Sequence, residues 1–151
     1  MSKSLDILIP RRLDDRKQRY KRIIYQKIKQ YIKNRCVGDL DLKGYPLQYL
    51  PDDLIFVNGH MWLNNSDIIS LNNLAKVTGT LFLNDTQIKS IGKLKYIGKS
   101  LNLINTPIES LGNLKYVGTN IWLYNTPLAK TYTEYEIRKM VDVRGIVYFN
   151  E

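Results

Sequence analysis

Hydrophobic residues recur at an interval of 20 positions between Val77 and Leu128. Written in rows of twenty, the sequence places aliphatic residues in fixed columns, among them Leu81, Leu101 and Ile121, then Leu83, Leu103 and Leu123. The columns extend back to Leu40 with one interval of 21 residues. Self-similarity at such a period is typical of a solenoid, whose stacked units bury one another's apolar faces. The pattern predicts four full units, 38–57, 58–77, 78–97 and 98–117, and a partial fifth that ends at 128.

Each unit begins with an alternating Leu-x-Leu segment, which predicts a short strand with both leucines directed into the core. About six such strands, stacked in parallel, would form one sheet along the solenoid. A glycine stands just before most of these strands, and we interpret it as a turn residue with left-handed dihedral angles. The glycines concerned are Gly59, Gly79, Gly98 and Gly118.

Residues 1–37 precede the repeats as a basic arm and helix. From Asp14 or Asp15 to about Arg35 the apolar residues follow the 3.6-residue period of an amphipathic helix, with Gly38 as the stop. Its expected apolar face consists of Tyr20, Ile23, Ile24, Ile28, Tyr31 and Ile32. We expect this face to cover the open end of the first unit. Residues 1–13 lack the period, so a docking segment, an added edge strand and a frayed terminus are alternatives.

Residues 129–151 lose the repeat register and are expected to form a C-terminal cap. Two overlapping Thr-x-x-Glu patterns, which begin at Thr131 and Thr133, are candidate capping boxes for a helix. Gly145 is the expected stop of that helix, and residues 146–149 the expected last strand. The arm, the solenoid over 38–128 and this cap would together form one structural domain.

The charged residues are distributed unevenly along the chain. The chain has 151 residues and a formal net charge of +9, and its single cysteine excludes a disulfide framework. Residues 1–37 hold 12 Lys and Arg against 3 Asp, whereas residues 38–151 hold 11 basic and 11 acidic side chains. Nothing resembles a signal peptide or an apolar run long enough to cross a membrane. We therefore expect a cytoplasmic protein without membrane contact, whose basic segment meets an acidic partner or is simply solvated.

The segment LNLINTPI (101–108) resembles the leucine-rich repeat, L-x-L-x-x-N-x-L, with threonine in place of the asparagine. The match recurs as LFLNDTQI (81–88), IWLYNTPL (121–128), MWLNNSDI (61–68) and LDLKGYPL (40–47). The unit length is similar to that of the shortest family members, which include bacterial effectors and small bacteriophage-encoded proteins. The resemblance implies an α/β repeat solenoid, a right-handed coil with a parallel concave sheet. It also implies an inhibitor or adaptor of a host protein in the host cytoplasm, or a minor virion component.

The resemblance makes two predictions about the turn after each strand. In the family the asparagine forms a ladder that satisfies backbone groups between coils. Here a hydroxyl would take over this role, at Ser66, Thr86, Thr106 and Thr126. The preceding residue is the expected turn former, at Asn65, Asp85, Asn105 and Asn125.

We predict that the protein is not an enzyme and uses no cofactor, metal or small-molecule substrate. His60 is the only histidine, and Cys36 has no obvious base partner and is best explained as a small buried residue. The sequence has no Cys/His metal-ligand spacing and no Gly-rich phosphate loop. Acid–base or nucleophilic catalysis requires two or three convergent groups, which the scattered carboxylates do not suggest.

The candidate binding residues lie between the two leucines of each strand. If the leucines point inward, the residue between them points outward. These outward positions hold Trp62, Phe82, Asn102 and Trp122, with Val147 or Phe149 expected in the last strand. Two positions later, the same face carries Asn64, Asn84, Ile104 and Tyr124. Exposed aromatic residues in a patch favour a protein interface, unless the caps fold over the rings.

The basic helix offers the alternative of nucleic-acid binding. Its candidate phosphate contacts are Arg16, Lys17, Arg19, Lys21, Arg22, Lys29 and Lys33. Tyrosines are interleaved with these residues, but no recognised nucleic-acid-binding motif accompanies them. The sequence thus predicts a protein-binding module, with non-specific nucleic-acid association as the alternative.

Overall fold

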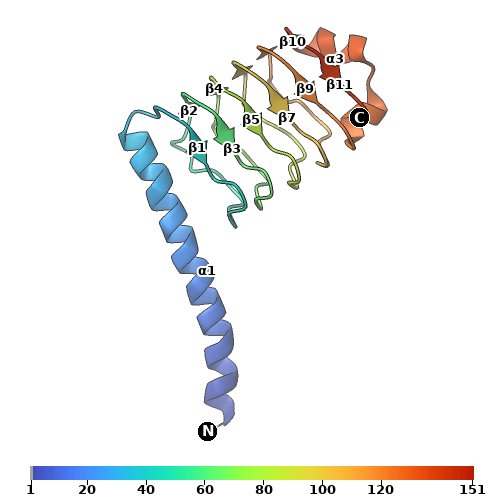
Figure 1. Ribbon diagram of the computed structural model, residues 1–151. Helices are drawn as coiled ribbons and strands as arrows, with labels where there is room; N and C mark the ends of the chain where they lie inside the picture. The colour runs from blue at the N-terminus through green and yellow to red at the C-terminus, as the bar shows by residue number, and fades with distance from the viewer. Residues whose placement is uncertain (1) are drawn as a thin grey trace.

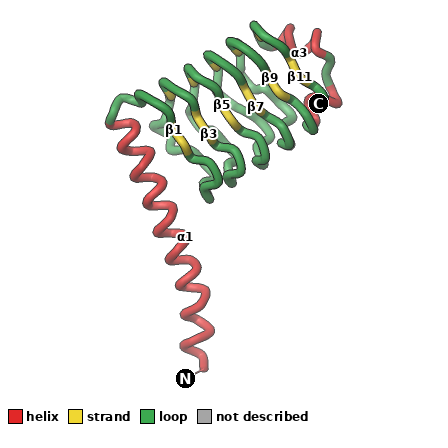
Figure 2. The backbone as a smooth tube through the Cα atoms, viewed as in Figure 1, coloured by secondary structure: helices red, strands yellow, loops and turns green. Residues whose placement is uncertain are grey.

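The computed structural model describes the backbone of residues 2–151 and the side chains from Asp15 onward. The chain is a parallel β-solenoid with a long helix at its N-terminal end and short helices at its C-terminal end (Figure 1). Loops make up most of each coil, and the strands are only two residues long (Figure 2). The predicted solenoid is therefore confirmed.

Six strands form the predicted sheet, one from each coil in order along the axis. They are β1 (Leu40–Asp41), β3 (Met61–Trp62), β5 (Leu81–Phe82), β7 (Leu101–Asn102), β9 (Ile121–Trp122) and β11 (Val147–Tyr148). All neighbours are parallel, and the register pairs equivalent positions: Leu81 lies between Met61 and Leu101. The 20-residue interval keeps every outward residue beside its counterpart in the next coil.

A second parallel sheet, which was not predicted, runs along another side of the solenoid. Its strands are β2 (Phe56–Val57), β4 (Lys76–Val77), β6 (Tyr96–Ile97), β8 (Tyr116–Val117) and β10 (Asp142–Val143). Isolated bridges mark a third side at Tyr49 with Ser70 and at Ser90 with Ser110. The aliphatic columns fill the interior, where most of these side chains are fully buried.

Besides the backbone hydrogen bonds between coils, a polar column that the sequence interpretation overlooked links one coil to the next. It consists of Asp39, His60, Thr80, Ser100 and Asn120, and we call it the acceptor ladder. Each of these side chains accepts the N–H of the equivalent residue in the next coil, as His60 Nδ1 does from Thr80 N at 2.9 Å. The predicted hydroxyl ladder is wrong, because each hydroxyl donates within its own coil. Ser66 and Thr86, for example, donate to the carbonyl three residues earlier at 2.5 and 2.7 Å.

The expected turn formers are confirmed, but the interpretation of the glycines is wrong. Asn65, Asp85, Asn105 and Asn125 have φ between 53° and 59°. The glycines before the strands do not have positive φ. A Cβ on Gly79 would stand 2.5 Å from the Gly59 carbonyl oxygen, so glycine is required there by the close approach of successive coils.

Helix α1 (Ser2–Lys33) begins about three turns earlier than predicted. Residues 2–13 are helical, so neither an added edge strand nor a helix start at Asp14 or Asp15 is correct. A helix that projects into solvent needs no apolar face, which explains why periodicity missed this part (Figure 1). The side chains of residues 1–14 lie outside the described part of the chain, so their docking role stays a prediction.

Only the last turns of α1 cover the first coil. Ile24 and Ile28 are buried, and the Tyr31 hydroxyl donates to the carbonyls of Cys36 and Gly38 at 2.7 and 2.8 Å. Tyr20 and Ile23, which were expected on the apolar face, are 49% and 58% exposed. The buried stripe is narrower than predicted because the helix leaves the solenoid at an angle.

The C-terminal cap contains α2 (Pro127–Thr131) and α3 (Glu134–Met140) before β10 and β11. Thr133 caps α3, and its hydroxyl and Glu136 form the capping box, whereas the pattern at Thr131 does not. Gly145 is not the helix stop, since α3 ends at Met140. No described helix of this chain is long and apolar enough to span a membrane.

Candidate partner-binding surface

The outward residues of the six-stranded sheet lie side by side, as predicted. The register aligns Trp62 with Phe82, Phe82 with Asn102, and Asn102 with Trp122. The last strand adds Tyr148 beside Trp122. We call these residues the aromatic row: Trp62, Phe82, Asn102, Trp122 and Tyr148. All are half-buried, because each ring covers its neighbour while its outer edge faces solvent.

The rings of the aromatic row form two stacked pairs. The centroids of Trp62 and Phe82 are 5.6 Å apart with an interplanar angle of 3°, and those of Trp122 and Tyr148 are 5.6 Å apart at 5°. Asn102 separates the pairs, and its Oδ1 accepts from Ile104 N at 3.1 Å. Because strands repeat about every 4.8 Å, aromatic side chains in adjacent coils stack without a change of backbone. The surface thus offers the outer edges of two stacked ring pairs, with the polar Asn102 between them.

The second row of this face is Asn64, Asn84, Ile104 and Tyr124, all half-buried. Tyr124 meets Tyr148 edge to face, with ring centroids 6.2 Å apart. Asn84 Nδ2 donates to Asp85 at 2.9 Å, while Asn64 Oδ1 is buried without a hydrogen-bond partner among the described residues. The predicted binding residues are therefore brought together on one face, and whether they bind a partner remains to be tested.

The sequence interpretation missed Tyr148. Val147 or Phe149 was expected to point outward, but Val147 is buried and Phe149 packs against the core. Val147-Tyr148-Phe149 is the last equivalent of Leu-x-Leu, a signal that was present in the sequence. It was overlooked because the two helices of the cap lengthen the last coil and shift its register.

None of the described helices covers this face. The nearest contact of α1 is at the first strand, where Lys27 Nζ donates to Asp41 O at 2.7 Å and lies 5.3 Å from the Tyr45 ring centroid. Helix α1 then projects away from the sheet, and the C-terminal helices lie at the other end of the solenoid (Figure 1). The half-buried rings are accordingly left uncovered by the described helices.

Charge is absent from the middle of this face. From β3 to β11 the aromatic row and the second row contain no Asp, Glu, Lys or Arg. The acceptor ladder beside them contributes the imidazole of His60 and neutral hydroxyl and amide groups over the same strands. Interface centres are depleted in charged residues and enriched in aromatic ones, and this face has both features.

The second sheet carries a different outward row, which the sequence interpretation did not predict. It consists of Phe56, Lys76, Tyr96 and Tyr116. The Lys76 ammonium lies 4.9 Å from the Tyr96 ring centroid and 5.9 Å from that of Phe56. Tyr96 and Tyr116 are stacked, with centroids 4.9 Å apart. Stacking therefore also occurs here, but next to a lysine.

The seven predicted phosphate-binding residues of α1 are exposed. None of them forms an ion pair with a described residue, because the two ion pairs within residues 15–151 lie near the C-terminus. The seven residues are Arg16, Lys17, Arg19, Lys21, Arg22, Lys29 and Lys33. Within residues 15–151 no ion pair neutralises their charge.

The His60 imidazole and the Cys36 thiol, the side chains considered above for catalysis, lie at structural positions. Asp39 lies before His60 in the acceptor ladder, and the single imidazole uses Nδ1 in that ladder. Cys36 is half-buried at the end of α1, and burial raises the pKa of its thiol, which disfavours the nucleophilic thiolate. Within residues 15–151 no group of three or more His, Cys, Asp and Glu side chains is placed to hold a metal ion.

The coils of 20 or 21 residues are compatible with a leucine-rich-repeat-like unit. Comparison with known proteins gives no match to a family model, to a curated protein or to a solved structure. Function must therefore be inferred from the geometry of this chain alone.

Proposed function

We propose that this protein is a non-enzymatic module that binds another protein through its six-stranded face. The observation that carries the proposal is the aromatic row: two stacked ring pairs on a face that has no charged side chain in either row from β3 to β11 and no covering helix among the described residues. Large apolar rings held rigidly on a surface lose little conformational entropy on binding, which favours their use as anchors.

The resemblance to short leucine-rich repeats supports the same interpretation and suggests the kind of protein in which such a module occurs. An inhibitor or adaptor of a host protein would use such a rigid face to hold one folded partner. Six strands span on the order of 25 Å, which suits a partner helix or a small domain better than a large obligate interface. A minor virion component is the alternative within the same class of function.

The test separates binding from folding. In Trp62→Ala/Trp122→Ala, one ring is removed from each stacked pair, which should destabilise the fold by about 0.5–1.5 kcal/mol per pair. At a binding hot spot the same change should weaken partner binding by 2 kcal/mol or more, roughly thirtyfold. Affinity capture of a binding protein from host lysate, followed by titration of that protein, measures the effect.

The matched control is Tyr96→Ala/Tyr116→Ala, which removes a stacked pair from the second sheet. It should leave partner binding unchanged. Equal loss of binding in both variants would contradict the proposal.

Nucleic-acid association through α1 is the second candidate, because seven exposed basic residues there have no carboxylate partner among the described residues. Counterion release would make such binding fall steeply between about 50 and 200 mM salt. Binding of DNA or RNA that is lost over this range, and that the tryptophan variant retains, would assign the activity to α1.

A further inference from the structure

The basic and acidic residues of the middle coils lie on different sides of the solenoid. The segments that contain β4, β6 and β8 of the second sheet are 71–77, 91–99 and 111–119, and they hold five lysines and no Asp or Glu. The acidic residues between positions 58 and 119 are Asp67, Asp85 and Glu109, which all lie in the intervening segments. The five lysines are exposed: Lys76, Lys93, Lys95, Lys99 and Lys115.

These five lysines have no anionic partner among the described residues. Lys93 Nζ donates to the neutral Asn73 Oδ1 at 2.8 Å. The Lys115 amide donates to the Lys95 carbonyl at 2.9 Å, so the stacking of coils places these two lysines side by side. Like charges at neighbouring positions of a sheet repel each other, and an anionic partner would relieve this repulsion.

The stacked pair of Tyr96 and Tyr116 lies in the middle of the five lysines. Lys95 and Lys115 immediately precede the two rings in the chain, and Lys99 follows Tyr96 by three residues. Tyr96 is 36% exposed. Positive charge therefore lies on both sides of an exposed apolar pair, and we call this surface the lysine patch: the five lysines with Tyr96 and Tyr116.

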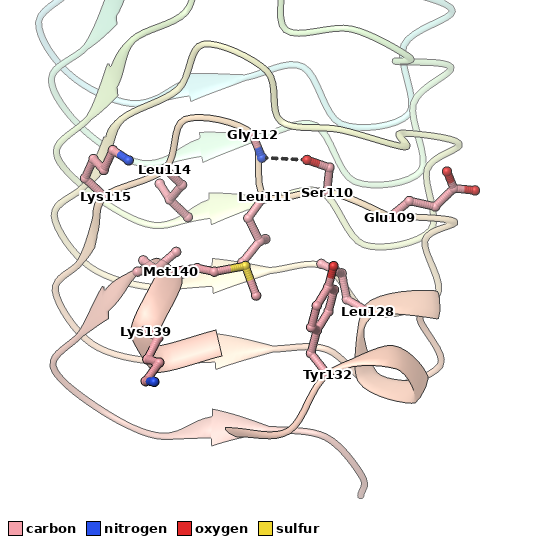
Figure 3. A pocket seen from close by; sticks show the side chains of 11 residues that line it. Glu109, Ser110, Leu111, Gly112, Leu114, Lys115, Leu128, Tyr132, Lys139 and Met140 are labelled. Atoms are coloured by element: carbon pink, nitrogen blue, oxygen red, sulfur yellow. Dashed lines mark hydrogen bonds between the residues drawn. The ribbon is translucent and has the colours of Figure 1, made fainter. Parts of the chain in front are cut away.

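The lysine patch has an end on each side. Beyond Tyr116 the register places Asp142, which forms an ion pair with Arg144 at 3.7 Å. Lys115 also lines a groove of about 400 Å³ beside the C-terminal cap (Figure 3), but Leu111 and Leu114 in its wall are only 5% and 2% exposed. The distance from β4 to β8 is about 10 Å, so the patch suits a short segment rather than a folded domain.

The geometry of the rings favours a protein segment over a nucleic acid. Sequence-tolerant binding of single strands requires open ring faces on which bases stack. Tyr96 lies between Lys76 and Tyr116 in the register, and the next residue beyond Tyr116 is Asp142, whose carboxylate repels phosphate. The tyrosines thus present ring edges and hydroxyl groups, which suit aliphatic and carboxylate side chains.

We propose that the lysine patch binds an extended acidic segment of a partner protein. Aliphatic side chains at the centre of the segment pack on Tyr96 and Tyr116, and carboxylates on either side of them meet the lysines. The predicted motif is a pair of apolar residues flanked by acidic residues. The patch belongs to the second sheet, so this binding does not depend on the aromatic row.

Two acetylated and amidated peptides of equal charge test the proposal: EEELLEEE and EEESSEEE. Each is titrated at low salt into the full chain labelled with nitrogen-15, and amide chemical shifts are followed. Shifts of Tyr96 and Tyr116 report binding at the patch, while shifts of α1 report any binding there separately. EEELLEEE should bind at the patch about fivefold more tightly, because its leucines bury apolar area against the rings.

A pair of charge variants locates the site. Lys95→Gln/Lys99→Gln/Lys115→Gln should weaken binding of EEELLEEE at the patch at least tenfold, because three ion pairs are lost. The matched control removes the same charge from α1, through glutamine at positions 17, 21 and 29. It should change the affinity at the patch less than twofold.

Variants of the two aromatic surfaces separate this site from the proposed function. In Tyr96→Ala/Tyr116→Ala the two peptides should bind equally, as followed by the amide shifts of Lys95 and Lys115. Trp62→Ala/Trp122→Ala should keep the preference for EEELLEEE, so failure of the proposed function would not affect this result.

Four results would overturn the proposal. No shift at the patch up to millimolar EEELLEEE would show that it accepts no acidic segment. Equal losses in the two lysine variants would show attraction by net charge alone, and equal binding of the two peptides to the unaltered protein would show that the rings make no contact. Tighter binding at the patch of an oligothymidylate with six phosphates would identify a nucleic acid as the occupant.

Discussion

The aliphatic side chains at the two ends of the solenoid are covered in different ways. Each end would expose a layer of aliphatic side chains to water if nothing covered it. At the N-terminal end α1 places Ile24, Ile28 and Tyr31 against the first coil, and all three are buried. The Tyr31 hydroxyl also satisfies two backbone carbonyls there. This end is closed by one continuous helix.

The C-terminal end is closed only in part. Helices α2 and α3 have 5 and 7 residues, and Ile137 is the buried side chain that α3 contributes. Helices this short present one apolar turn, whereas a coil has a longer perimeter to cover. The comparison teaches that coverage depends on the length of the apolar stripe that meets the end coil, and that a short cap leaves an apolar side chain such as Met140 41% exposed.

The largest expected effect is at the closed end. Ile28→Ala should lower the free energy of unfolding by about 2–5 kcal/mol, because it opens a cavity between α1 and the first coil. Urea unfolding followed by circular dichroism measures this change. A loss below about 0.5 kcal/mol would show that α1 does not contribute to closing the solenoid.

A smaller loss of unfolding free energy is expected when the Tyr31 hydroxyl, which holds α1 to the first coil, is removed. Tyr31→Phe removes two hydrogen bonds to carbonyl groups and should cost about 0.5–1.5 kcal/mol at pH 8. Burial raises the pKa of Tyr31 to about 12, so the folded state keeps this proton at pH values where the unfolded state loses it. The stabilisation by the neutral phenol is complete below pH 10 and is lost as the pH rises towards 12.

Urea unfolding of both proteins at pH 8 and pH 11 checks this sign. The difference in unfolding free energy between the unaltered protein and Tyr31→Phe should be smaller at pH 11. A constant difference would mean that Tyr31 ionises as readily in the folded chain as in the unfolded one.

The smallest change in unfolding free energy is expected at the C-terminal end. Met140→Ala removes a side chain that is 41% exposed and lies beside a groove, so the unfolding free energy should change by no more than about 0.5 kcal/mol. The same urea titration applies, with Ile28→Ala as the reference. A loss as large as that of Ile28→Ala would show that the C-terminal cap is packed as tightly as α1.

The predicted outward positions on the six-stranded sheet were largely right because they follow from local periodicity. Trp62, Phe82 and Trp122 occupy the outward position between two inward leucines, and the structure places them in one row. Tyr148 was missed because the cap helices change the spacing to the last strand. The stacking of the rings could not be predicted from the sequence, because periodicity fixes the direction of a side chain but not the ring geometry.

The sequence by itself determined the coil length, the interior columns and the direction of the outward residues. A fixed interval of alternating apolar positions has one way to bury them all, by stacking equivalent residues. Only the tertiary structure decided how the ends are closed, where the second sheet forms and which polar column links the coils. These features depend on contacts between residues about 20 positions apart or on the angle at which a helix meets a coil, and no local pattern specifies either.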